Sequence, residues 1–162
     1  MSQGFEENYA AVMVLFALVF FTGSLLLAPV MMRTKSTIQL KEIITPIIFM
    51  IGVIYIITSI FASVLEYIPD LVFYVLSILM FLLFVFMCFY IAFINKHPKN
   101  IYVFIVGIGY TLVCSGAVLY EMFYPSVILI GAVNLFEIIA QFYFVLYITH
   151  IAEIAKEKKW FI

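Results

Sequence analysis

The chain has 162 residues, of which 67% are hydrophobic and only 10% are charged. A soluble domain averages about 45–50% apolar and about 25% charged residues, so this composition excludes a water-soluble fold. The formal net charge of −1 offers no basic surface for nucleic acid, and nucleic-acid partners are therefore not expected. The partner that the composition does indicate is a lipid bilayer.

Five apolar runs predict five transmembrane helices, in chain order 9–32, 43–66, 70–95, 100–121 and 125–152. Each run exceeds the ~20 residues that cross a ~30 Å hydrocarbon core at ~1.5 Å per residue. Runs that are solidly apolar, without a two-residue alternation, favour helices over the strands of a barrel. We therefore predict an all-α, polytopic integral membrane protein in which residues 1–162 form one transmembrane domain.

The basic residues gather on one side of this arrangement. The gaps after the first and third runs and the C-terminal tail hold all of them: Arg33, Lys35, Lys41, Lys96, Lys99, Lys156, Lys158 and Lys159. The N-terminus and the other gaps carry Glu6, Glu7, Glu66, Asp70 and Glu121 instead. The positive-inside rule then predicts a multi-pass cell-membrane protein with its N-terminus outside and its C-terminus in the cytoplasm. The acidic outer rim is hydrated surface, or alternatively a weak site for a hard cation.

No motif for catalysis, cofactor binding or metal binding appears in the chain. Cys88 and Cys114 fall at different depths of their predicted helices, so a disulfide between them is not expected. His97 and His150 both fall near the inner interface, but no Cys or acidic residue completes a recognisable metal spacing with them. We therefore expect a protein that is not an enzyme and that holds no cofactor.

The second and third helices resemble the fourth and fifth, as if one hairpin were repeated over 43–95 and 98–152. A shift of 55 residues places Phe49 on Phe104 and aligns two helix faces. One face holds Gly52, Tyr55, Ser59, Ala62 and Glu66, and the other holds Gly107, Tyr110, Cys114, Ala117 and Glu121. Small residues let helices approach closely in lipid, so each face is predicted to pack on the other or on its own hairpin partner. A chance match in a biased composition is the alternative.

Glu137 is the ionisable residue predicted nearest to mid-membrane, roughly 18 Å deep because twelve residues at ~1.5 Å separate it from Pro125. Asn134 and Gln141 share its helix face. A charge at that depth costs at least ~2.5–3.5 kcal/mol, so Glu137 should face protein rather than lipid. Three partners stay open: the hydroxyl of Tyr110 at a similar level, a cation or metal from another subunit, or a transported proton or cation.

These features leave three hypotheses for function. The first is a non-catalytic accessory subunit of a multi-subunit membrane complex of the respiratory, oxidase or monooxygenase type, packed against other integral-membrane subunits. The absence of a catalytic constellation and of a soluble domain, together with 19% aromatic residues, favours it. The alternative is a small transporter or ion carrier that uses Glu137. A membrane sensor or assembly factor is the third, without specific support.

Overall fold

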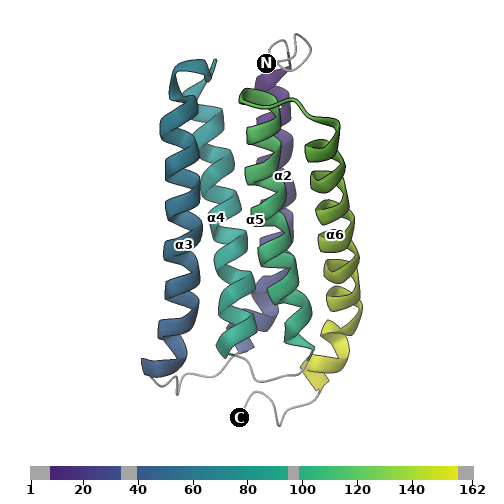
Figure 1. Ribbon diagram of the computed structural model, residues 1–162. Coiled ribbons are helices and arrows are strands. Elements are labelled where there is room, and N and C mark those ends of the chain that lie inside the picture. Colours follow the sequence, from purple (N-terminus) through teal and green to yellow (C-terminus); the bar gives the residue numbers. More distant parts are fainter. Residues whose placement is uncertain (1–7, 34–39, 95–98, 157–162) are drawn as a thin grey trace.

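The computed structural model describes residues 8–33, 40–94 and 99–156. Five long helices make up most of these ranges: α2 (Tyr9–Arg33), α3 (Leu40–Val64), α4 (Leu71–Ile94), α5 (Asn100–Met122) and α6 (Val127–Lys156), with a short 3-10 turn, η1 (Leu65–Tyr67), after α3. The described ranges contain no strand, and the helices run side by side (Figure 1). All five are long and apolar enough to cross a membrane, which confirms the predicted five-helix membrane fold.

Successive helices run in opposite directions, so helix ends that carry basic residues lie together at one end of the bundle (Figure 1). Arg33 closes α2, Lys99 precedes α5 and Lys156 closes α6, all at one end, which we call the basic end. Asp70 lies in the turn between α3 and α4, and Glu121 lies near the end of α5. These two carboxylates mark the opposite, acidic end.

Local sequence chemistry sets the turn between α3 and α4. Pro69 has no backbone N–H to continue a helix, and η1 ends just before it. Asp70 then caps α4, because its Oδ1 accepts hydrogen bonds from the backbone N–H of Val72 at 2.9 Å and of Phe73 at 3.5 Å. The cap satisfies donors that the first turn of a helix otherwise leaves without partners.

The helix α4 lies at the centre of the bundle and packs against α2, α3 and α5. The helix α6 packs along α5 and contacts the other helices little, so α3 and α6 occupy opposite edges (Figure 1). Both edge helices present wide apolar faces outward; Ile51 of α3 is 61% exposed and Ile138 of α6 is 64% exposed. A lipid bilayer is the solvent that accommodates such faces.

The main core fills the basic half of the bundle with aromatic rings. Phe89 of α4 is 1% exposed, and its ring lies 5.3 Å from that of Phe49 on α3 and 6.0 Å from that of Phe104 on α5. A smaller buried cluster near the acidic end contains Tyr9 and Tyr74. The two clusters are separate, so the buried residues do not form one continuous core along the bundle.

Candidate functional site

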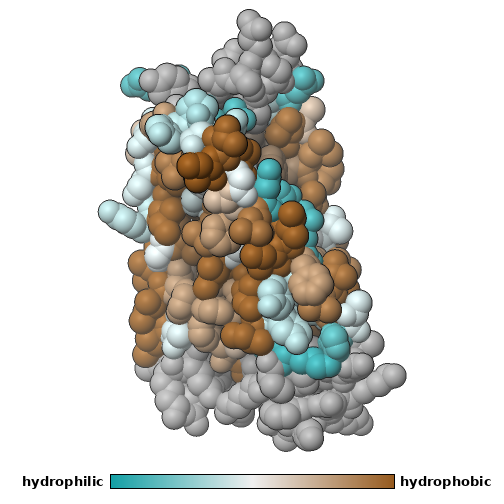
Figure 2. All heavy atoms as spheres, turned by 45° about the vertical axis from the view of Figure 1, so that its right-hand side comes forward, coloured by the Kyte–Doolittle hydropathy of each residue, from teal (hydrophilic) through white to brown (hydrophobic). Residues whose placement is uncertain are grey.

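A strip of polar side chains runs along the exposed flank of α6; we call Asn134, Glu137 and Gln141 the α6 strip. Asn134 and Gln141 are exposed, and Glu137 between them is half-buried. Gln141 Nε2 donates a hydrogen bond to Glu137 Oε1 at 2.9 Å, one helical turn away. From the α6 side, hydrophilic side chains form a patch at mid-height within a hydrophobic surface (Figure 2). The three residues that the sequence grouped therefore do lie together.

The strip is exposed because α6 docks on α5 through the neighbouring face. Val133 and Ala140 are buried there, seven residues apart. A Cβ added to Gly109 of α5 would lie 2.9 Å from the Cβ of Ala140, and one added to Gly116 would lie 2.7 Å from Val133 Cγ2. Glycines in α5 thus allow a close approach of α6. Adjacent residues of a helix point about 100° apart, so the strip lies beside this contact rather than within it.

Tyr110, the fourth residue predicted for the polar site, belongs to the aromatic core. Its ring meets Phe20 of α2 and Phe84 of α4 edge to face, with centroids 5.7 and 5.6 Å apart. Glu137 forms its side-chain hydrogen bond with Gln141, and no bond joins it to the Tyr110 hydroxyl in the described chain.

The packing face predicted on α3 does not pack within the chain, and this part of the prediction is wrong. Its five members are all exposed: Gly52, Tyr55, Ser59, Ala62 and Glu66. No atom lies within 4 Å of a Cβ added to Gly52, and Tyr55 is 71% exposed. Instead α3 buries Val53, and the ring of Phe49, although 37% exposed, contacts Phe89 of α4 and Phe104 of α5. Larger side chains make more contacts across a helix pair than small ones do.

The corresponding face of α5 is in contact with neighbours. A Cβ added to Gly107 would lie 3.0 Å from the Phe89 ring and 3.2 Å from the Cβ of Cys88, both on α4. Further along the same face, Cys114 and Ala117 line a cavity. The two faces that the repeat pairs thus have different surroundings, and the hairpin repeat stays a prediction.

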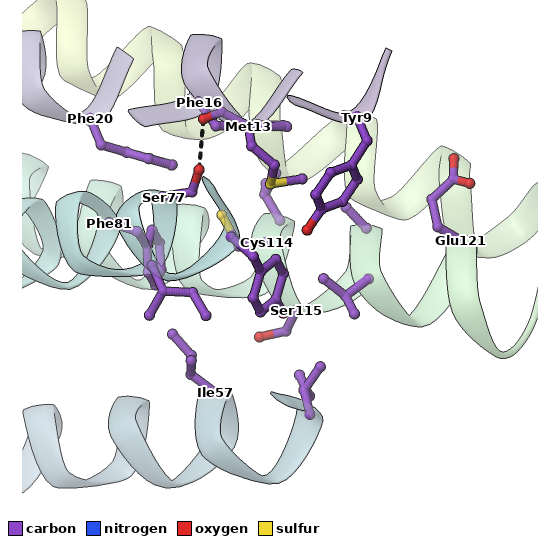
Figure 3. A pocket seen from close by; sticks show the side chains of 16 residues that line it. Tyr9, Met13, Phe16, Phe20, Ile57, Ser77, Phe81, Cys114, Ser115 and Glu121 are labelled. Carbon is purple, nitrogen blue, oxygen red and sulfur yellow. Dashed lines mark hydrogen bonds between the residues drawn. The ribbon is translucent and has the colours of Figure 1, made fainter. Parts of the chain in front are cut away.

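The cavity lies in the acidic half, between α2, α3, α4 and α5, and measures about 160 Å³ (Figure 3). Its wall is apolar along most of its length and includes Met13, Phe16, Ile57, Phe81, Val113 and Ala117. Tyr9, Ser115 and Glu121 belong to the wall at or near its acidic end (Figure 3). Phe16 is 42% exposed and Glu121 is half-buried, so the cavity is reached from the surface of the bundle.

The chemistry of the wall suits a hydrocarbon better than an ion. The Ser77 hydroxyl donates a 2.6 Å hydrogen bond to the Met13 carbonyl and is thereby satisfied. Within the described ranges, no three His, Cys, Asp or Glu residues gather as a metal site would require.

A buried polar cluster near the basic end joins three helices. The Tyr147 hydroxyl of α6 donates a hydrogen bond to Asn100 Oδ1 at 3.2 Å, and Asn100 Nδ2 donates to the Ile91 carbonyl of α4 at 3.4 Å. Tyr147 is fully buried and Asn100 is 2% exposed. This pair was not predicted from the sequence, although an Asn at the start of an apolar run was a signal for it. The cluster has a structural role, because it fastens α4, α5 and α6 together.

Comparison with known proteins adds no assignment to this geometry: no family model, no curated protein and no solved structure matches the chain. A functional assignment therefore rests on the chemistry of the α6 strip and of the cavity.

Proposed function

We propose that this chain is a non-catalytic accessory subunit of an integral-membrane complex, and that the α6 strip packs against a transmembrane helix of another subunit. The single observation that carries the proposal is the exposure of Asn134 and Gln141 amid the apolar flank of α6. Each amide both donates and accepts hydrogen bonds, and lipid tails provide neither. A polar side chain from a neighbouring helix provides both.

The energetics favour a protein neighbour over lipid. Leaving an amide without hydrogen bonds in hydrocarbon costs roughly 4–8 kcal/mol on scales where the solvent cannot bond. The bond between Gln141 and Glu137 uses one donor of the Gln141 amide and leaves its carbonyl oxygen and second N–H available. Interhelical hydrogen bonds in membranes contribute about 0.6 kcal/mol on average, so several such contacts together stabilise an assembly.

One observation keeps the alternative of a proton or ion carrier open. Glu137 is a carboxyl in the middle of a candidate membrane span, and it is half-buried rather than fully exposed to lipid. The cavity wall, however, does not include Glu137, and its apolar lining is unfavourable for an ion path. Liposome flux that Glu137→Gln abolishes would favour the carrier over the accessory subunit.

The accessory role is tested by purifying the full chain from native membranes in mild detergent. The variant Asn134→Leu/Gln141→Leu removes both exposed amides, and we expect it to lose the co-purifying membrane proteins that the unchanged chain retains. A matched control, Ser59→Leu/Ser63→Leu, alters two exposed polar residues of α3 and should retain them. If the unchanged chain purifies alone as a monomer, the proposal fails. Loss in the α3 variant alone would move the interface to α3.

We also propose that the basic end faces the cytoplasm of a cell membrane, with the N-terminus outside. The gathering of Arg33, Lys99 and Lys156 at one end supports this orientation. Single cysteines introduced at Ser2 and at Lys158, in a chain without Cys88 and Cys114, provide the test. An impermeant thiol reagent should label only the first in intact cells, and labelling of only the second would reverse the orientation.

A further inference from the structure

The cavity has the length of one membrane leaflet. Its wall on α2 extends from Tyr9 to Phe20, eleven residues apart, which is roughly 16 Å at ~1.5 Å per residue. Half of a ~30 Å hydrocarbon core is about the same length. The cavity therefore begins at the acidic end of the bundle, where the membrane surface lies, and ends near the membrane centre.

The two ends of the cavity differ in chemistry. At the membrane centre its wall is formed by rings such as Phe20 and Phe81, whereas Tyr9 and Glu121 lie at the acidic end (Figure 3). Asp70, half-buried just before α4, lies at the same end of the bundle. None of the described residues at this end is Lys or Arg. The site is thus apolar within the hydrocarbon and negatively charged at the headgroup level.

From this geometry we propose that the cavity is a binding site for a phospholipid with a primary ammonium headgroup. One acyl chain lies along the apolar wall, and the ammonium group lies beside Glu121. A phospholipid combines an apolar chain of leaflet length with a headgroup at the interface, which matches the arrangement of the wall. An ammonium group donates hydrogen bonds to a carboxylate, whereas a choline headgroup has no N–H to donate. The Phe16 side chain, exposed at the rim, marks contact with bulk lipid.

Fluorescence quenching tests for the acyl chain. The chain contains one tryptophan, Trp160, so Trp160→Phe gives a background without indole. Two variants of this background are compared: Phe81→Trp in the cavity wall, and Phe89→Trp, eight residues along the same helix and outside the wall. Both parent phenylalanines are buried, at 4% and 1% exposed, so bulk lipid reaches neither position. The proteins are reconstituted in nanodiscs of phosphatidylethanolamine that carries bromine on its acyl chains.

We expect Phe81→Trp to be quenched several-fold more strongly than Phe89→Trp, because bromine quenches only on contact. Equal quenching of the two positions would overturn the proposal. The same comparison in unbrominated lipid gives the reference intensities for each indole.

Lipid retention gives a second measurement that does not depend on a tryptophan variant. Native mass spectrometry of the full chain in mild detergent should find one retained phospholipid. Ala117→Leu fills part of the cavity and should lower the retained fraction several-fold, whereas Ala62→Leu, on the exposed face of α3, should not. Absence of lipid from the unchanged chain, or equal loss in both variants, would count against the site.

The headgroup is tested by competition. In mixed vesicles the unchanged chain should retain phosphatidylethanolamine over phosphatidylcholine by about threefold, a preference within the range of an exposed ion pair. Glu121→Gln should remove that preference, so that the two lipids are retained in equal proportion. A preference that survives Glu121→Gln, or one for phosphatidylcholine or phosphatidylglycerol in the unchanged chain, would overturn the assignment of the ammonium headgroup.

Discussion

The basic and acidic halves of the bundle are built in different ways. In the basic half, the rings of Phe49, Phe89, Phe93 and Phe104 pack with centroids 5.2–6.5 Å apart. In the acidic half, the helices that surround the main core also enclose a cavity of about 160 Å³. The contrast indicates that one half holds the fold while the other has room for a ligand.

Helix packing explains why the difference arises. The helices α4 and α5 meet closely at the basic end, where Gly107 lies against Phe89 and Cys88. Toward the acidic end, residues of α4 and α5 line the cavity between them, with α2 and α3 completing the wall. The same helices are therefore closely packed in one half and enclose a cavity in the other.

The largest expected effect compares two buried phenylalanines of α4. Phe89→Ala should lower the free energy of unfolding by about 3–5 kcal/mol, because it removes a ring from the closely packed core. Phe81→Ala should cost less, at the low end of that range at about 3 kcal/mol, because its side chain borders a cavity that lipid or detergent can enter. Denaturation of both variants in the same detergent, followed by circular dichroism, measures the difference. An equal loss would remove the distinction between the two halves.

A second comparison sharpens the contrast between closely packed and open positions. Gly109→Ala should destabilise by about 1–3 kcal/mol, because its Cβ would lie 2.9 Å from the Cβ of Ala140 and a helix backbone must shift. Gly52→Ala meets no atom within 4 Å and should be neutral or stabilise α3 by up to about 1 kcal/mol. Thermal unfolding in detergent measures both. Destabilisation by Gly52→Ala would indicate that α3 has a close neighbour in the purified protein.

Much of the fold was predictable from the sequence, because length and apolarity alone determine which segments cross a membrane. The run predicted over 100–121 is the helix Asn100–Met122, and the run over 9–32 is the helix Tyr9–Arg33. Which helices pack against each other, and through which faces, was harder to predict from the sequence. The reason is that the apolar runs carry side chains of similar hydropathy on every face. Spacing therefore suggested that Gly52 and Ala62 pack, whereas the α3 residues that contact α4 are Val53, which is buried, and the partly exposed ring of Phe49.

Of the two candidate sites, the α6 strip was predictable from the sequence and the cavity was not. The sequence grouped Asn134, Glu137 and Gln141 correctly, since polar residues at helical spacing must share a face. It could not find the cavity, because an internal space depends on how the side chains of four helices pack against one another. Most residues that line it, such as Met13 and Val113, are ordinary apolar residues that carry no sequence signal. The acidic residue Glu121 was predicted at the outer rim and on the repeated helix face, but not as part of a cavity.

The smallest expected effect concerns the polar cluster that fastens the basic half. Tyr147→Phe removes the hydroxyl that donates to Asn100 Oδ1, in a site where both side chains are buried. We expect a loss of about 1 kcal/mol in unfolding free energy, the usual net contribution of one hydrogen bond. Tyr143→Phe is the matched control on the same helix. The half-buried ring of Tyr143 packs on Tyr102, and the Tyr143 hydroxyl makes no hydrogen bond within the described chain. Urea denaturation measures both variants. A lower midpoint for Tyr147→Phe alone would show that the bond to Asn100 contributes to the stability of the basic half. The same midpoint for both variants would show that the bond does not stabilise it.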